Sequence, residues 1–477
     1  MEKKNICLDL NNTVWEKESA LGARYCKAEG VLYCHSSTAP DKQRLNIYVP
    51  VEYLNGDGTV NRSGRCGGYT AETAPILYIN GIGLYLGKVP YKITEKDDTL
   101  AGKNGWYYDY VKQGYVIVFA GARGKDDLDE NSLAVGKAPV GLSDLKAGVR
   151  FLRRNKDKIP GDTDKIISSG MSAGGAMSIL LAASGNSDKF DYHLKAMGAV
   201  MDERDDVFAS QAYCPITDLD RADTAYEFMY INDDNGIANG MGAFNKALSE
   251  KLFSEYISYL NGRNITVGGV SYTLGADGRS GSFYDYILGK FVSSYRAEND
   301  GPLPSFLSSL DTIVKNHNHR SKACPCFDSL FSGGEGASVE CGVFGRMRSK
   351  PTDPDFKRHF SPSVAEQIAA LKDRFQGEYD EYYKLYKAQS ESEDVKEQVA
   401  LYNPYTYLDE GKTRVASKIR ICVGSMDSAT STAVSAQLAL TLASRGIDTE
   451  YEIMWGQGHT DADREGEFIA WVNRISK

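Results

Sequence analysis

The chain has 477 residues, 42% of them hydrophobic and 25% charged, so it can bury one large core and part of a second. Its formal net charge of −9, with no block of Lys and Arg to offset it, disfavours nucleic acid and anionic membrane surfaces as partners. No apolar run approaches the length of a membrane span and no signal-like stretch follows the first residues, so we expect a cytoplasmic protein.

The first part of the chain alternates strand and helix patterns. "APILYING" (residues 74–81) and "GYVIVFAGARG" (114–124) are short β-rich runs ended by glycine, typical of strands buried on both faces. "SDLKAGVRFLRRN" (143–155) predicts a helix with Ser143 as its N-cap. A strand, a glycine turn, an alanine-rich helix and "AYCPITDLD" (212–220) follow. This alternation predicts a mainly parallel sheet covered by helices on both faces.

The pattern then breaks and later resumes. The middle of the chain is polar and tyrosine-rich, with a hairpin expected over 265–278 and a charged helix over 375–398. The α/β pattern returns with a strand at 418–428, a helix at 432–446 that ends at a C′ glycine, a strand at 449–455 and a final helix. We therefore expect an α/β core formed by residues 1–222 and 401–477, interrupted by an inserted lid domain at 223–400. A lid over the carboxyl ends of a parallel sheet predicts a small-molecule site.

One serine turn stands between a predicted strand and a predicted helix. Gly170-Met171-Ser172-Ala173-Gly174 fits the Gly-x-Ser-x-Gly pattern, in which a strained corner exposes the serine hydroxyl. The pattern alone is weak, but its position after "KIIS" and before an alanine-rich helix predicts that Ser172 is a catalytic nucleophile.

A serine nucleophile needs a base and an acid that orients the base. Of the six histidines, His459 follows the last predicted strand and precedes the last helix, so it is the expected base. Two aspartates end strands after the nucleophile. Asp427 gives the chain order Ser, Asp, His expected of this fold, while Asp218 remains an alternative acid.

The reaction also needs donors for an oxyanion. One is the backbone N–H of Ala173, directly after the nucleophile, and the second is expected from the loop after the strand at 74–81. We assign the second donor to Ile82, with Gly81 and Gly83 as neighbours that help expose an N–H there.

No metal or other cofactor is expected. Nine scattered cysteines in a long chain indicate reduced thiols rather than a disulfide framework. A cluster in the insert has histidines and cysteines, but their spacing matches no common zinc site. Its members are His317, His319, Cys324 and Cys326.

Several stretches together resemble the bacterial tannase family of α/β-hydrolases. They are "IPGDTDKIISSGMSAGGAMSILLAASGNSDKF", "GARGKDD", "VGLSDLKAGVRFLRRN", "YCPITDLDRADTAYEFMY", "LYNPYTYL" and "GQGHTDAD". The resemblance implies an α/β-hydrolase fold and an esterase of galloyl or related phenolic esters, with Ser172, Asp427 and His459 as the triad. The resemblance also places lid residues that grip ring hydroxyls near "FGRMRSKPTDPDFKRHFSPSVAEQ", where Lys350 and Glu366 are the candidates and a solvated loop is the alternative.

The sequence departs from the tannase pattern at one position. Two residues after the triad aspartate, the family carries a second acid that accepts hydrogen bonds from gallate hydroxyls, and here that position is Ala429. Fungal tannases are less similar, because the paired cysteines beside their serine and histidine are Met171 and Thr460 here. We expect weakened selectivity for gallate.

The sequence thus predicts a serine carboxylesterase that acts on a small aromatic ester through an acyl-enzyme. A feruloyl, hydroxycinnamoyl or general aryl esterase without gallate selectivity is the alternative. A serine peptidase is disfavoured because no propeller-like repeat or acidic clamp is visible. A non-catalytic binding protein is disfavoured because every catalytic role has a residue. The sequence leaves the acyl and alcohol groups and the oligomeric state open.

Overall fold

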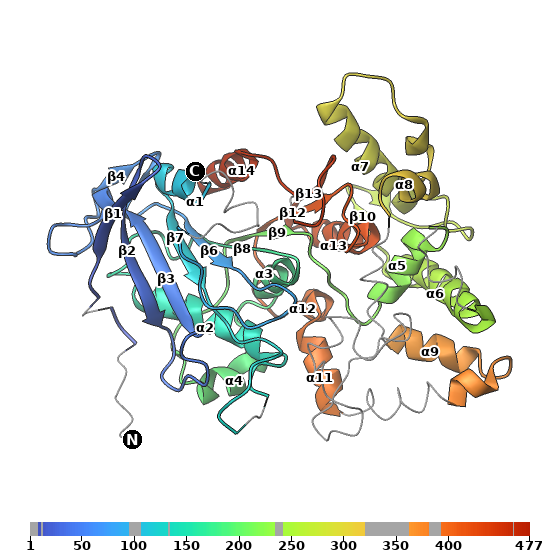
Figure 1. Ribbon diagram of the computed structural model, residues 1–477, viewed down its shortest axis with the longest axis horizontal. Helices are drawn as coiled ribbons and strands as arrows, with labels where there is room; N and C mark the ends of the chain where they lie inside the picture. The colour runs from blue at the N-terminus through green and yellow to red at the C-terminus, as the bar shows by residue number, and fades with distance from the viewer. Residues whose placement is uncertain are drawn as a thin grey trace. The chain divides into compact units, whose positions relative to one another are not determined.

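The computed structural model describes residues 8–10, 13–94, 106–131, 134–233, 242–319, 362–380, 393–460 and 462–477 (Figure 1). The chain divides into two compact units, and each unit is built from segments that are distant in the sequence. The first unit comprises Met1–Tyr213, Tyr407–Ile419 and Asp463–Lys477, and the second comprises Cys214–Thr406 and Arg420–Ala462. The expected division at residues 222 and 400 stays a prediction.

In the described part of the first unit, seven strands are neighbours in one sheet, in the order β1-β2-β3-β7-β6-β8-β9. Antiparallel pairing joins β1, β2, β3 and β7, whereas β7, β6, β8 and β9 pair in parallel. The strands are β1 (Glu16–Ala20), β2 (Ala23–Leu32), β3 (Arg44–Pro50), β6 (Ile76–Asn80), β7 (Val116–Ala120), β8 (Ile166–Met171) and β9 (Ala209–Tyr213), besides the two-residue strands β4 (Arg65–Cys66) and β5 (Tyr69–Thr70).

The parallel strands follow from their sequences. Every side chain of β6 and β7 is buried, as expected for apolar runs covered on both faces. The predicted strands at 74–81 and 114–124 are confirmed. Ile79 pairs with Phe119 on one side and with Ser169 on the other, so the carboxyl ends of β6 and β8 lie at the same edge. Parallel α/β sheets place their ligand sites at this edge.

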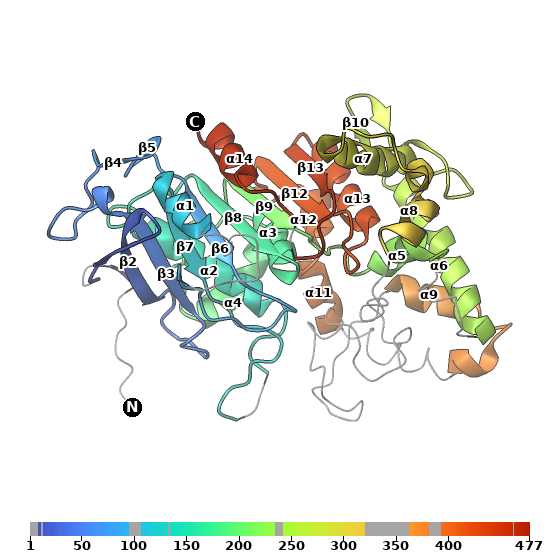
Figure 2. The same cartoon turned by 45° about the horizontal axis from the view of Figure 1, so that its top comes forward.

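Helices cover both faces of this sheet (Figures 1 and 2). On one face, a ring contact between Tyr110 and Phe468 joins α1 to α14. The helices of the unit are α1 (Trp106–Lys112), α2 (Val140–Arg154), α3 (Ala173–Ala183), α4 (Asp191–Ala196) and α14 (Glu467–Ser476).

The predicted N-cap of α2 was wrong. The helix begins at Val140, so Ser143 lies inside its first turn rather than before it. The Ser143 hydroxyl donates to the carbonyl of Pro139, 3.1 Å away, which satisfies a fully buried side chain within the helix. The apolar face that predicted the helix is present, but a serine at its start gave the wrong boundary.

The second unit holds the expected insert together with the later strands. β12 (Lys418–Gly424) begins in the first unit and ends in the second, and β13 (Asp448–Met454) is its neighbour in sheet order. The remaining elements are α5 (Ala222–Tyr230), α6 (Gly242–Gly262), β10 (Thr266–Val267), β11 (Val270–Ser271), α7 (Ser282–Glu298), α8 (Leu310–Asn316), α9 (Pro362–Ala370), α11 (Glu393–Leu401), α12 (Pro404–Glu410) and α13 (Thr432–Ser444). The hairpin predicted over 265–278 and the C′ glycine, Gly446 with φ 79°, are confirmed.

An apolar core within the insert joins α6 to α9. Its members repeat at helical spacing, so each helix presents one apolar face. They are Phe244, Ala247, Leu248, Leu252, Val364, Ile368 and Leu371. The charged helix predicted over 375–398 lies partly outside the described residues. Among the helices of the described part of the chain, none is both long and apolar enough to cross a membrane.

Candidate active site

Ser172 occupies the corner between β8 and α3 in the first unit. Its φ of 57° and ψ of −123° lie outside the regions that residues with a Cβ favour. Such strain is typical of a nucleophile displayed on a strand-to-helix turn. The Ser172 N–H donates to the carbonyl of Tyr213 at 2.9 Å, and this bond ties the corner to β9.

The glycines around Ser172 are required for close packing. A Cβ on Gly170 would lie 2.4 Å from the carbonyl oxygen of Gly174, and one on Gly174 would lie 2.7 Å from Oδ1 of Asn80. A Cβ on Gly175 would lie 2.5 Å from the carbonyl oxygen of Tyr213. Each distance is far shorter than a real Cβ contact, so larger residues would open the corner. This is the close strand–helix approach that the serine motif predicts.

Asn80, the last residue of β6, holds the corner from the side. Its side chain is 4% exposed, and its amide group bonds within the first unit. Nδ2 donates to the Ser169 carbonyl at 3.2 Å, the Gly174 carbonyl at 3.1 Å and Ser178 Oγ at 3.0 Å. Oδ1 accepts from the Ile82 N–H at 3.4 Å, which is a long bond. Sequence reasoning missed this residue, although a polar side chain at the end of a buried strand was a usable signal.

The predicted oxyanion donors lie on two elements of the first unit. Ala173 is the first residue of α3, where a backbone N–H has no acceptor within the helix. A Cβ on Gly81 would lie 2.1 Å from the ring of Tyr91, so a larger residue there would displace that side chain. A Cβ on Gly83 would meet nothing within 4 Å. Packing therefore favours glycine at position 81 but not at position 83.

A cavity of about 90 Å³ lies beside this corner. Its walls are the loop that follows β6, the end of β8 and three tyrosines. The loop and tyrosine residues are Gly81, Ile82, Gly83, Tyr91, Tyr107 and Tyr213. A small, mostly apolar space is therefore available next to the serine turn.

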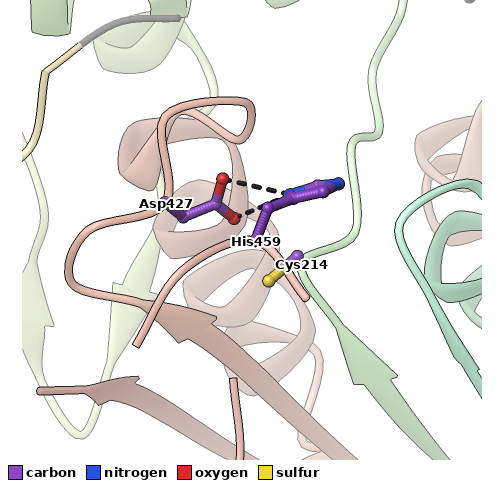
Figure 3. A group of neighbouring side chains, drawn as sticks. All are labelled: Cys214, Asp427 and His459. Carbon is purple, nitrogen blue, oxygen red and sulfur yellow. Dashed lines mark hydrogen bonds and ion pairs between the residues drawn. The ribbon is translucent and has the colours of Figure 1, made fainter. Parts of the chain in front are cut away.

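The second unit holds the predicted base and acid as a pair (Figure 3). Nδ1 of His459 lies 3.0 Å from each carboxylate oxygen of Asp427. The Asp427 side chain is 1% exposed, whereas that of His459 is 23% exposed. The backbone N–H groups of Ala429 and Thr430 donate to Asp427 Oδ1 at 2.8 and 2.9 Å. Burial alone would raise the Asp427 pKa, but the charge and hydrogen bond of His459 and the Thr430 N–H lower it overall.

The loops that carry these two side chains are bonded to each other. The Met426 N–H donates to the carbonyl of Gln457 at 2.9 Å. A Cβ on Gly424 would lie 2.3 Å from that same oxygen and 2.4 Å from the carbonyl oxygen of Gly458. Only glycine at position 424 lets the loop that follows β12 lie this close to the loop that follows β13.

A fully buried thiol, Cys214, lies beside the pair. It directly follows β9, and its sulfur lies within 4.8 Å of a carboxylate oxygen of Asp427. Burial, followed by the charge of Asp427, raises the pKa of the Cys214 thiol well above its ordinary value. The thiol beside the carboxylate is therefore protonated. In the sequence, this cysteine is one of nine scattered residues that are expected to be reduced thiols.

Asn318, in the insert, supports the backbone of the acid loop. Its Nδ2 donates to the carbonyl of Ser425 at 2.8 Å and to that of Asp427 at 3.2 Å. Its Oδ1 accepts from the Tyr230 hydroxyl at 2.9 Å. Nδ2 thus joins the insert to the loop that carries the acid, while Oδ1 ties Asn318 to Tyr230 at the end of α5. No local sequence signal indicated this role.

His317 is held by packing and by one hydrogen bond. Its ring stacks on Trp455 with centroids 4.2 Å apart and an interplanar angle of 9°. Its Nε2 lies 2.8 Å from Ser425 Oγ. These contacts hold the His317 ring in place. Of the other cluster residues considered for zinc, His319 lies 3.7 Å from Asp233, while Cys324 and Cys326 lie outside the described residues.

Asp218, the alternative acid, belongs to a different buried network. Its carboxylate accepts from the Tyr259 hydroxyl at 2.7 Å and from Asn403 Nδ2 at 3.1 Å. Its φ is 57°, and burial raises its pKa. The hydrogen bond from His459 goes to Asp427, so the geometry favours the chain order Ser, Asp, His.

Of the two predicted lid residues, the structure describes only Glu366. Glu366 is exposed on α9, and Lys350 lies outside the described residues. Ala429 is half-buried, with its N–H bonded to Asp427 and its carbonyl accepting from the Tyr226 hydroxyl. Its methyl group is the part left to meet a ligand.

The BD-FAE family matches residues 91–256 of the chain. In a comparison with curated proteins, none matches the chain. The native tannin acyl hydrolase from Lactobacillus plantarum is similar over 98% of both chains, with 28% identity and a TM-score of 0.79. A tannin acyl hydrolase in complex with ethyl gallate has 28% identity over 98% of both chains and a TM-score of 0.78. The tannase of Fusobacterium nucleatum has 29% identity over 98% of this chain and 99% of its own, with a TM-score of 0.78.

These likenesses extend over nearly the whole chain, insert included, and they confirm the predicted α/β-hydrolase fold. They also confirm the resemblance that the sequence motifs indicated. The chain is therefore a tannase-like α/β-hydrolase, an ester hydrolase.

Proposed function

We propose that the chain is a serine carboxylesterase that hydrolyses small esters of phenolic acids through an acyl-enzyme, with Ser172, His459 and Asp427 as its triad. The hydrogen-bonded His459–Asp427 pair carries this proposal, because a buried ionised acid on Nδ1 is what a general base requires. The strained corner at Ser172 and the similarity to a tannin acyl hydrolase in complex with ethyl gallate add support.

The reaction follows from these roles. Ser172 Oγ attacks the ester carbonyl and forms a bond to carbon while its proton passes to Nε2 of His459. The tetrahedral intermediate collapses, the alcohol leaves with that proton, and water repeats the sequence on the acyl-enzyme. Asp427 stays ionised, holds Nδ1–H and stabilises the positive ring that forms in each half of the reaction.

The oxyanion is bound by the N–H of Ala173 and by an N–H of the loop 81–83. The Ile82 N–H makes only a long bond of 3.4 Å to Asn80, so it can turn to a charged oxygen with little loss. A hydrogen bond to an anion is about twice as strong as a neutral one, which favours that exchange.

We also propose weak selectivity for gallate. The N–H of Ala429 donates to Asp427 and its carbonyl accepts from Tyr226 of α5, so this position offers a methyl group where the tannase pattern has an acid. A methyl group gives no hydrogen bond to a ring hydroxyl and loses none when that hydroxyl is absent. Hydroxybenzoate and hydroxycinnamate esters are then hydrolysed as efficiently as galloyl esters. In this proposal, Lys350 and Glu366 are the lid residues that contact the ring.

The test compares Ser172→Ala with the wild type on methyl gallate, methyl 4-hydroxybenzoate, methyl ferulate, p-nitrophenyl acetate and an aminoacyl amide. We expect essentially no turnover by Ser172→Ala, because the nucleophile is lost while the corner keeps its packing. Unchanged hydrolysis by that variant would refute the mechanism, and cleavage of the amide alone would indicate a peptidase. A preference of about a hundredfold or more for gallate over 4-hydroxybenzoate in kcat/KM would show that other residues replace the missing acid.

A further inference from the structure

The backbone of Cys214 is held in a conformation that few residues with a Cβ adopt. Its φ is 48°, a strained conformation that persists only where surrounding contacts impose it. The Cys214 N–H donates to the carbonyl of Cys422 at 2.7 Å, and the Cys214 carbonyl accepts from Thr430 Oγ1 at 3.3 Å. These contacts fix the backbone of Cys214 and with it the direction of its Cα–Cβ bond.

That direction brings three different donor atoms together within the second unit (Figure 3). The sulfur of Cys214, a carboxylate oxygen of Asp427 and a ring nitrogen of His459 all lie within 4.8 Å of one another. Each comes from a different segment, the residues after β9, β12 and β13. Among the described residues this is the only such group of three.

The donor set suits a thiophilic divalent cation. Zn²⁺ binds sulfur at about 2.3 Å and nitrogen or oxygen at about 2.0–2.2 Å, so its ligand atoms lie roughly 3.3–3.8 Å apart. Small movements of the three side chains reach those separations from the present arrangement. His459 provides the path of entry, since 23% of its side chain is exposed while Asp427 is closed to solvent.

We propose that Cys214, Asp427 and His459 form an inhibitory site for Zn²⁺ or Cd²⁺. The proposal rests on the proposed function in that two of the three ligands are the acid and base of the reaction. The cation would compete with catalysis rather than assist it.

Inhibition follows from the tautomer of the imidazole. The cation takes the lone pair of His459 Nδ1, and the proton that Nδ1 shared with Asp427 moves to Nε2. Nε2 is then a donor and cannot accept the proton of Ser172, so acylation stops. The thiol of Cys214 releases its proton to solvent as its sulfur binds, the Asp427 carboxylate binds as it is, and no electron is transferred.

The binding test does not depend on turnover. Cd²⁺ is titrated into the full chain and into Ser172→Ala, and the ultraviolet charge-transfer band of a Cd²⁺–thiolate bond is recorded. We expect the same band in both proteins, its loss in Cys214→Ser, and its retention in Cys34→Ser, which removes another fully buried free thiol. Retention of the band in Cys214→Ser would overturn the proposal.

A second variant keeps the strained cysteine intact. His459→Ala removes one ligand and is expected to weaken Cd²⁺ binding at least tenfold, whereas unchanged affinity would overturn the proposed ligand set. Cys324→Ser/Cys326→Ser should bind as the wild type does, and loss of the band there would place the cation elsewhere.

The kinetic test uses the esterase assay. Zn²⁺ should inhibit the wild type reversibly, chelator should restore activity, and Cys214→Ser should need at least ten times more Zn²⁺ for half-inhibition. Equal sensitivity of Cys214→Ser and Cys34→Ser would refute the site. Turnover by Ser172→Ala would instead refute the proposed function, and the Cd²⁺ band would still decide the metal site.

Discussion

The contact between the acid loop and the histidine loop makes Gly424→Ala a sharp test of the candidate site. The new methyl group would lie 2.3 Å from the carbonyl oxygen of Gln457 and 2.4 Å from that of Gly458, where ordinary contact begins at 3.4 Å. Both atoms belong to backbone, so the two loops must separate by about 1 Å. A displacement of about 1 Å in a catalytic group costs on the order of a hundredfold in rate.

We therefore expect kcat of Gly424→Ala on a phenolic ester to fall about a hundredfold, because Asp427 no longer holds His459 in place. Overpacking of this kind also lowers the free energy of unfolding by about 1–3 kcal/mol. Steady-state kinetics and urea unfolding measure the two effects separately.

Gly458→Ala is the matched control. It lies next to His459 in the sequence, yet its added methyl group would meet nothing within 4 Å. Its kcat should stay close to that of the wild type. The reasoning fails if Gly424→Ala keeps wild-type activity, or if Gly458→Ala loses as much activity as Gly424→Ala.

Other contacts of the second unit give further predictions. Asp427→Asn should lower kcat by roughly three to four orders of magnitude, because it leaves the imidazole in the wrong tautomer. If Asp218→Asn shows this loss and Asp427→Asn does not, Asp218 is the acid. Burial raises the pKa of Asp218 and Asp220 above 3.8, so the folded chain binds their protons more tightly than the unfolded chain does. Their contribution to the free energy of unfolding is therefore lost as the pH rises from about 4 through the raised pKa values. Urea unfolding at several pH values should show a smaller loss of stability over this range in Asp218→Asn. An unchanged pH dependence in that variant would contradict the raised pKa of Asp218. Asn318→Leu should lower kcat about tenfold or more with little change in KM, because the acid loop loses its support. Asn316→Leu should not, because Asn316 is exposed at the end of α8, two residues before Asn318. Equal kinetics in the two variants would refute the positioning role.

The core strands and the serine turn could be predicted from short local sequence patterns. A strand buried on both faces must be a continuous apolar run, as "VIVFA" is in β7, so its position can be inferred without knowing its neighbours. The glycines around Ser172 were informative for a similar reason, since a Cβ at any of them meets backbone or a buried side chain.

Residues that act through distant partners could not be predicted in this way. Asn80 bonds to Gly174, 94 positions along the chain, and Asn318 bonds to Ser425, 107 positions along. Nothing in the residues around them indicates those partners. Cys214 looks like an ordinary buried cysteine in the sequence, and only its left-handed backbone and its place beside Asp427 set it apart.

The bonds from Asn318 bear on how such enzymes can be recombined. An insert that determines substrate choice invites exchange between relatives, on the assumption that the catalytic loops belong wholly to the conserved core. Here the carbonyls of Ser425 and Asp427 receive their hydrogen bonds from the insert itself, and Tyr230 of α5 holds the same asparagine from the other side. A chimera that imports a foreign insert without an asparagine at this position would therefore carry a loosened acid. Transplanting the insert with its own acid loop keeps the two matched.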